Sequence, residues 1–411
     1  MKRIIYLDNN GTTKLCKEGK CSMVKWLDRY ANPSTNSIIS KDASELINLT
    51  KKQILAHCDA KDYTVVITSG ASESNCLILR STADAYRFHT DKTPHIITSA
   101  IEHKSILDCC GDLVTKKLAT VSFVEPDMYG CTRPQNIEKE ITENTALISV
   151  MIANNEIGCI NNIKEIGRIA HEHKIPLHTD AVQYFGKYRI SLPEYNIDAM
   201  TVSLHKFHGP VGIGLLIVAN NLIEGYGLNG QISGTQQNNL RGGTENIAAI
   251  SACIPTLKHV FTSRSSKNER LYKLREQLIS GLENKIKKGN FSSYLGENKN
   301  TANEFIVLGP PPPYVLPNTI LLSFVKNTTE GEPFCNGKLK KYMSDNGVIV
   351  AVGSACSTDC KSASHVINAL KAPPAVRQGV IRISMSDLTT PQEIKKTIPL
   401  LIKGVRKQMS L

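Results

Sequence analysis

The sequence has no long apolar segment, which excludes most classes of membrane protein. No apolar run approaches the ~20 residues that a membrane-spanning helix requires. The residues from Met1 to Asp8 contain neither the apolar stretch nor the small-residue cleavage site of a signal peptide, and a polar segment follows at once. We therefore expect a cytoplasmic protein that makes no contact with a membrane.

Closely spaced metal ligands are also missing. The 411 residues include twelve cysteines, but no two of them form a C-x-x-C pair. Structural zinc sites usually take their ligands from such pairs, so we expect no metal site. Scattered cysteines in a chain of this length indicate free thiols in a reducing compartment rather than a disulfide framework.

The net charge is +12, yet the lysines are spread along the chain. The densest basic run, residues 285–288, falls in a predicted helix. This distribution favours a solvated basic face, or a face that docks an acidic protein or an anionic substrate, over nucleic-acid binding.

Short β-branched runs alternate with helical patterns between residues 45 and 250. Most of these runs are apolar on both faces, as is typical of buried strands in a mainly parallel sheet. Helical spacing of apolar residues predicts helices over Glu73–Ala85 and Ile163–His173. The predicted strands are Thr64–Thr68, His95–Ser99, Ala119–Val124, Ala146–Ile152, Pro176–His178, Ala199–Ser203 and Gly214–Val218.

This pattern predicts an α/β fold with helices on both faces of one seven-stranded sheet. A long amphipathic helix over residues 271–286 and a smaller α+β region should follow it. The four prolines Pro310–Pro313 cannot lie inside a helix or a central strand, so we expect a surface loop there.

Two residues next to predicted strands suggest a cofactor. Lys206 lies just after a strand, and lysine is the residue that binds pyridoxal 5'-phosphate (PLP) covalently, although this segment alone also fits a loop lysine. Asp180 ends the preceding strand, where α/β proteins bind ligands. Its carboxylate would either hold a protonated pyridine nitrogen or cap the next helix.

Two further segments have similar double interpretations. Thr68–Asn75 reads as a strand, a turn of small residues and a helix start, which would bind a phosphate or would simply be a capped helix. Cys356 lies among small polar residues, a setting that suits a reactive thiol, but it could equally be a structural cysteine.

Taken together and in this order, these segments resemble the cysteine desulfurases, in the class V aminotransferase branch of PLP enzymes. The resemblance extends from Tyr6 to beyond Arg382. The other matching segments are Tyr6–Asn9, Asn32–Ser34, Ile101–Lys104, Ala153–Gly158, Arg241–Thr244, Leu316–Thr319 and Ile381–Ser384. The segment Gly353–Cys356 resembles group I, the NifS/IscS type, whose long mobile cysteine loop carries sulfur to an acceptor.

The resemblance implies the fold of PLP-dependent transferases of fold type I. Residues 15–257 would form the large PLP-binding domain. Residues 1–14 and 258–411 would form the small C-terminal domain with the cysteine loop. The resemblance also implies a homodimer that converts L-cysteine to L-alanine. Sulfur would pass to an acceptor or scaffold protein for iron–sulfur cluster assembly or thiolation.

The resemblance assigns roles to individual residues. Lys206 would hold the cofactor and carry protons, His103 would stack on its ring, and Arg382 would bind the substrate carboxylate through its guanidinium fork. The Cys356 thiolate would accept the sulfur as a persulfide. The remaining cofactor contacts would come from Asp180, Gln183, Asn155, Ala71, Ser72, Ser203, His205 and, across the dimer, Thr244; Asn155 would also contact the substrate.

Several positions depart from the family pattern and leave two alternatives open. The departures include Asn10-Gly11, Ser37, residues 232–239 and Cys360. One alternative is a selenocysteine lyase or another class V lyase or aminotransferase, and the other is a non-catalytic scaffold of the same fold. Cys356 favours desulfuration because a simple aminotransferase does not need it, and the intact site residues argue against a scaffold.

Overall fold

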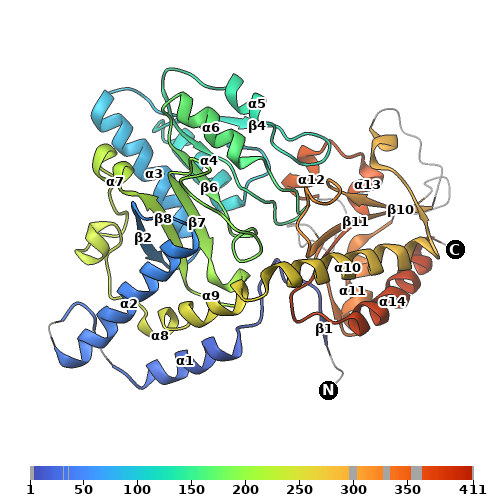
Figure 1. Cartoon of the computed structure of the whole chain (residues 1–411). Coiled ribbons are helices and arrows are strands. Elements are labelled where there is room, and N and C mark those ends of the chain that lie inside the picture. The colour runs from blue at the N-terminus through green and yellow to red at the C-terminus, as the bar shows by residue number, and fades with distance from the viewer. Residues whose placement is uncertain are drawn as a thin grey trace.

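The computed structural model describes residues 4–30, 32–35, 37–295, 303–326, 334–352 and 363–409. It has a larger and a smaller lobe, and the chain crosses from one to the other through the long helix α10 (Arg264–Glu283). Figure 1 shows the N-terminal segment lying against the smaller lobe, which also contains the C-terminal helix α14 (Pro391–Met409).

A seven-stranded sheet forms the centre of the larger lobe, as predicted. Its strands are β2 (Tyr63–Thr68), β3 (His95–Ser99), β4 (Thr120–Val124), β5 (Thr145–Ser149), β6 (Leu177–Asp180), β7 (Ala199–Ser203) and β8 (Gly214–Ala219). They lie in the order β2-β8-β7-β6-β5-β3-β4, and β8 alone runs antiparallel to its neighbours. The prediction extended β5 to Ile152; residues 150–152 instead leave the regular ladder, although Val150 and Ile152 still donate to β6 carbonyls.

Alternate residues of each strand supply two apolar layers, because successive side chains point to opposite faces of a sheet. Ile67, Ile148 and Ile217 belong to the cluster that includes α2, α6 and α9. On the other face, Val66 and Leu216 pack with α3, and Leu147 packs with α3 and α4. The helices of this lobe are α1 (Lys17–Leu27), α2 (Ile38–His57), α3 (Ala71–Thr90), α4 (Lys104–Thr115), α5 (Pro134–Lys139), α6 (Ile163–Glu172), α7 (Asn220–Tyr226), α8 (Ile247–Ile250) and α9 (Cys253–Phe261).

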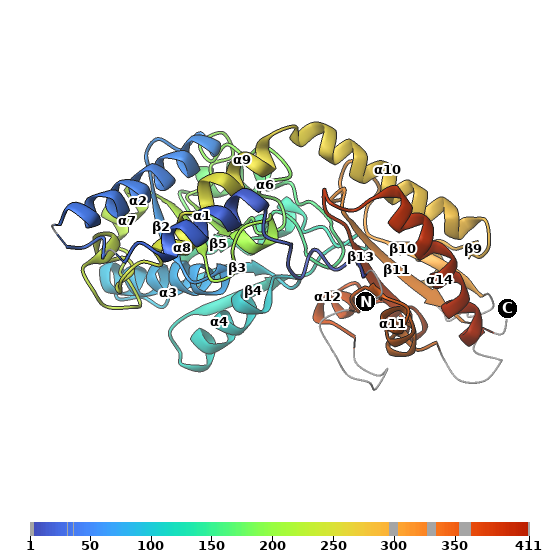
Figure 2. The same cartoon turned by 90° about the horizontal axis from the view of Figure 1, so that it is seen from below.

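The smaller lobe has a four-stranded sheet in the order β13-β11-β10-β9 and a two-stranded sheet of β1 and β12. Helices α10 and α14 lie together in the apolar cluster on one face of the larger of these sheets (Figure 2). Its strands and remaining helices are β1 (Ile5–Tyr6), β9 (Lys287–Lys288), β10 (Glu304–Leu308), β11 (Thr319–Val325), β12 (Val348–Ile349), β13 (Val380–Ser384), α11 (Asn336–Asp345), α12 (His365–Ala369) and α13 (Pro374–Gln378).

The predicted helix over residues 271–286 is correct up to Glu283 and wrong beyond it. Residues 287 and 288 of the basic run form the edge strand β9, which pairs with β10. Lys287 lies opposite Glu304 and forms an ion pair with it at 3.4 Å, so the tertiary pairing overrides the helical pattern. The residues from Pro310 to Pro313 form a loop, as expected, in which Pro310 is buried and the other three prolines are exposed.

Free thiols predominate, with one exception. Nine of the ten cysteines that the structure describes are free thiols, as expected, whereas Cys335 is disulfide-bonded, which was not expected. Within the described ranges, no helix has the length and apolar character needed to cross a bilayer. The domain boundaries at residues 15 and 257 stay a prediction.

Candidate active site

A cavity of about 490 Å³ lies at the carboxyl edge of the larger sheet. This edge collects polar residues because β2, β3, β5, β6 and β7 all point toward it, and ligands of α/β proteins bind there. Ten of the predicted site residues line the cavity: Ala71, Ser72, His103, Asn155, Asp180, Gln183, Ser203, His205, Lys206 and Arg382. Segments far apart in the sequence therefore meet at one place.

Lys206 lies on a short turn of 3₁₀ helix, Leu204–Lys206, directly after β7. Its Nζ donates to the backbone carbonyls of Asn10 at 2.8 Å and Gly11 at 2.7 Å. Burial, reinforced by the positive charge of Arg382, lowers the pKa of Lys206 to about 8. About 9% of this amine is neutral at pH 7 and about half at pH 8, and only the neutral form of a lysine attacks a carbonyl carbon.

Asp180 ends β6 and is held by two hydrogen bonds. Its Oδ1 accepts from the Val182 amide at 2.9 Å, and its Oδ2 accepts from the Asn75 side chain at 3.0 Å. The same Asn75 amide group donates to Ser105 Oγ at 3.0 Å. Both bonds fix the orientation of the buried carboxylate within the cavity.

His103 caps the N-terminus of α4, and this fixes the tautomer of its neutral ring. The Ser105 amide donates to His103 Nδ1 at 3.2 Å, so the proton of the neutral imidazole resides on Nε2. Desolvation in the cavity is the main cause that lowers the pKa of His103, and the charge of Lys206 lowers it further. His103 is therefore a neutral base or donor near pH 7.

The turn between β2 and α3 forms an anion cradle. Ser69 to Ser72 line the cavity at the N-terminus of a 20-residue helix, where free amides and the helix dipole favour a phosphate. A Cβ atom at Gly214 would lie 2.3 Å from the carbonyl carbon of Gly70, so only glycine lets β8 approach this turn. Ser203 and His205 also border the cavity, and burial lowers the pKa of His205 to about 4.

Arg382 on β13 brings the smaller lobe into the site. Its guanidinium donates to Asp8 Oδ1 at 2.6 Å and to the Asn155 carbonyl at 3.1 Å, while Nε has no partner among the described residues. Arg382 thus binds a carboxylate already, which is the chemistry expected for a substrate carboxylate.

Several residues at the site have no role among the predictions made from the sequence. Asp8 pairs with Arg382, the carbonyls of Asn10 and Gly11 hold Lys206, and Asn75 with Ser105 connects Asp180 to His103. Residues 8–11 form a polar segment just after β1, which the sequence shows, but backbone carbonyls leave no sequence signal.

Two predicted residues do not line the cavity. Thr244 is exposed and lies outside this cavity. Its predicted contact with the phosphate would therefore have to be made in the cavity of another subunit. Cys356 lies outside the described residues, as does its neighbour Cys360.

The family model for class V aminotransferases matches residues 5–307. The chain belongs to the class V aminotransferase family. It is 33% identical to the cysteine desulfurase IscS of Dictyoglomus turgidum, over 99% of this chain and 96% of that protein. Among solved structures, a NifS-like protein matches with a TM-score of 0.81 at 27% identity over 99% of both chains. SspA in complex with cysteine matches with a TM-score of 0.74 at 28% identity over 94% of this chain and all of SspA.

These matches confirm fold type I and PLP dependence, the properties of the family. The residues of the cavity fit PLP chemically. They provide a helix N-terminus for a phosphate, a buried carboxylate for a pyridine nitrogen and a lysine with a depressed pKa for an aldehyde.

Proposed function

We propose that this protein is a cysteine desulfurase of group I that converts L-cysteine to L-alanine and passes the sulfur to Cys356. One observation carries the proposal: a single cavity brings together Lys206, Asp180, His103 and Arg382. The names of the relatives, cysteine desulfurase IscS and NifS-like protein, support it. Because Lys206 belongs to the larger lobe and Arg382 to the smaller lobe, the site needs both lobes.

The chain's own residues would hold PLP in defined places. Ala71, Ser72, Ser203 and His205 would bind the phosphate, and Asp180 would hold the protonated pyridine nitrogen. Asn155 and Gln183 would lie near the phenolic oxygen. When bound, PLP supplies an electron sink for the negative charge that develops at the substrate Cα.

Arg382 and Lys206 would act on the substrate itself. The cysteine carboxylate would replace Asp8 on the guanidinium, which places the substrate Cα within the cavity. The neutral amine of Lys206 would then take the Cα proton, and its pKa near 8 lets it return that proton at neutral pH.

The sulfur step would fall to Cys356. Its thiolate would attack the substrate sulfur, the bond between carbon and sulfur would break, and the bonding electrons would stay with the carbon that becomes the alanine methyl group. Neutral His103, with its proton on Nε2, would donate or accept a proton near the substrate thiol. An acceptor or scaffold protein for iron–sulfur cluster assembly or thiolation would take the persulfide sulfur.

We also propose a homodimer in the cytoplasm, with the large domain over residues 15–257. Three large apolar side chains on and between α1 and α2 are exposed: Leu27 by 69%, Tyr30 by 90% and Ile38 by 91%. Large apolar patches exposed on one subunit are typical of protein interfaces, and these three side chains would contribute to such a patch. Thr244 is exposed too, so it is free to reach the phosphate site of a second subunit.

The test is product stoichiometry. PLP-loaded protein is mixed with L-cysteine and a thiol reductant, and sulfide and alanine are assayed together. We expect equal amounts of both products, and loss of both in Lys206→Ala and in Cys356→Ala. Cys21→Ala, which removes an exposed thiol on α1, is the matched control and should keep full activity. Turnover of selenocysteine but not cysteine would contradict the proposal.

A further inference from the structure

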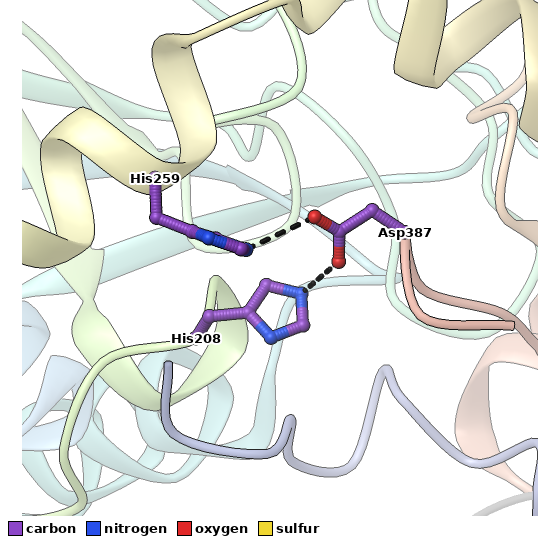
Figure 3. A group of neighbouring side chains, drawn as sticks. All are labelled: His208, His259 and Asp387. Carbon is purple, nitrogen blue, oxygen red and sulfur yellow. Dashed lines mark ion pairs between the residues drawn. The ribbon is translucent and has the colours of Figure 1, made fainter. Parts of the chain in front are cut away.

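Three potential metal ligands meet outside the active-site cavity. They are His208, two residues after Lys206, His259 on α9 and Asp387 in the loop after β13. Figure 3 shows their side chains converging from three separate segments, with both imidazole rings directed at the carboxylate. His208 is buried, and the other two are partly buried.

The contacts between these groups are short but do not satisfy them. His208 Nε2 lies 2.8 Å from Asp387 Oδ1, and His259 Nε2 lies 3.0 Å from Oδ2. Nevertheless, neither His259 Nε2 nor Asp387 Oδ1 has an aligned hydrogen-bond partner among the described residues. A buried polar atom without a partner is costly, and an ion that both atoms could bind would satisfy them.

The tautomer of His208 adds a second argument. Its Nδ1 lies 2.8 Å from the Lys14 carbonyl oxygen, which can only accept, so Nδ1 carries a proton. In neutral His208, Nε2 therefore presents a lone pair to a carboxylate oxygen, and two lone pairs repel. A positive charge must lie between them, either a second proton or a metal ion. A backbone carbonyl on Nδ1 is also the usual support of a histidine that binds metal through Nε2.

The surroundings include one competing charge and some free space. Lys267 Nζ lies 3.3 Å from Asp387 Oδ2 and also donates to the His259 carbonyl at 2.5 Å, a bond that it can keep if it turns from the carboxylate. Arg270 donates to the backbone carbonyls of Asp387 and Thr389. A cavity of about 60 Å³ borders His208 and Asp387, which is enough room for an ordered water molecule.

We propose that His208, His259 and Asp387 bind one divalent cation of the zinc class, with a water molecule as the fourth ligand. Two imidazole nitrogens and a carboxylate form a ligand set that Zn²⁺ accepts in tetrahedral geometry. The ion would tie the Asp387 loop, five residues beyond Arg382, to the segment that carries Lys206. The ligands are 51 and 128 residues apart in the sequence, which is why no ligand spacing reveals the site.

The experiment locates the ion by its position, because the free cysteines of this chain will also bind zinc. Crystals of the PLP-loaded protein are soaked with Zn²⁺, and anomalous diffraction at the zinc edge maps every bound ion. We expect one ion at about 2.0–2.2 Å from both Nε2 atoms and the Asp387 carboxylate. Asp387→Asn and His259→Gln should lose this ion, and His171→Gln, which alters an exposed histidine on α6, should keep it.

The variant Lys267→Met distinguishes a cluster that binds a metal ion from a cluster that binds a proton. A unit charge ~5 Å from a dication weakens binding by about tenfold or more even with the screening of bulk water. Removing Lys267 should therefore lower the Kd for zinc at this position by at least about tenfold. Calorimetric titration of Lys267→Met measures this change, and the double variant Lys267→Met/Asp387→Asn reports the binding that does not involve Asp387. If saturating zinc leaves the position empty in the wild type and in Lys267→Met, or if His259→Gln retains the ion, the proposal is wrong and the cluster holds a proton instead. His259 is partly exposed, so its variant serves if Asp387→Asn does not fold.

Discussion

The depressed pKa of Lys206 predicts how the cofactor-free protein captures PLP. Only the neutral amine attacks the aldehyde, so the capture rate should rise with pH through about 8 and then level off. An ordinary lysine, with a pKa near 10.5, would give a rate that still rises above pH 10. The position of the midpoint therefore reports the environment of this single amine.

The size of the effect follows from the two pKa values. At pH 7 about 9% of an amine with a pKa of 8 is neutral, against about 0.03% for a pKa of 10.5, a difference of about 300-fold in the reactive form. Burial is the larger cause of the shift, and the charge of Arg382 adds to it. Arg382→Gln should accordingly move the midpoint toward higher pH without abolishing capture.

The assay follows the absorbance of protein-bound PLP after mixing at a series of pH values. N-acetyl-lysine in parallel corrects for the titration of PLP itself. Lys187 provides a matched control because burial also lowers its pKa to about 8, yet it does not line the active-site cavity. Lys187→Met should keep capture, with a midpoint that moves only upward because the two lysine charges repel each other, and Lys206→Ala should lose capture. A midpoint near 10, or capture that Lys187→Met abolishes, would refute the reasoning.

Three further variants test separate parts of the site. Arg382→Lys, which lacks the planar fork, should lower kcat/KM for L-cysteine by about 10- to 100-fold, chiefly through KM, in steady-state assays; an unchanged KM would exclude carboxylate binding. Asn75→Ala, which leaves Asp180 Oδ2 without its donor, should destabilise the protein by about 1–3 kcal/mol in urea unfolding and weaken PLP retention, whereas unaltered stability would contradict the network. Gly214→Ala should weaken PLP retention at equilibrium dialysis, because its methyl group would displace Gly70; retention equal to wild type would show that the cradle tolerates the shift.

The central sheet was predictable because its strands have one dominant signal. The buried runs of β3 and β7 are apolar on both faces, and their predicted bounds match the structure at both ends. The helix predicted for the start of the basic run at residues 285–288 was wrong at its end. Lys287 pairs with Glu304 of β10 in the sheet and forms an ion pair with it, and no local sequence pattern contains this contact.

The site was predictable where a side chain carries the chemistry and less so where the backbone does. Lys206, Asp180 and Arg382 lie in recognisable segments and line one cavity. The carbonyls of Asn10 and Gly11 that hold Lys206 belong to no side chain, and the pairing of Asp8 with Arg382 links positions 374 residues apart. Such contacts depend on how the two lobes meet.

The most direct test of the account is a single turnover. PLP-loaded protein is given one equivalent of L-cysteine per site without reductant, alanine is quantified, and peptide mass spectrometry locates the transferred sulfur. We expect one alanine per site and one additional sulfur atom on Cys356. Alanine without sulfur on Cys356, or sulfur on Cys360 or another cysteine in its place, would contradict the central claim.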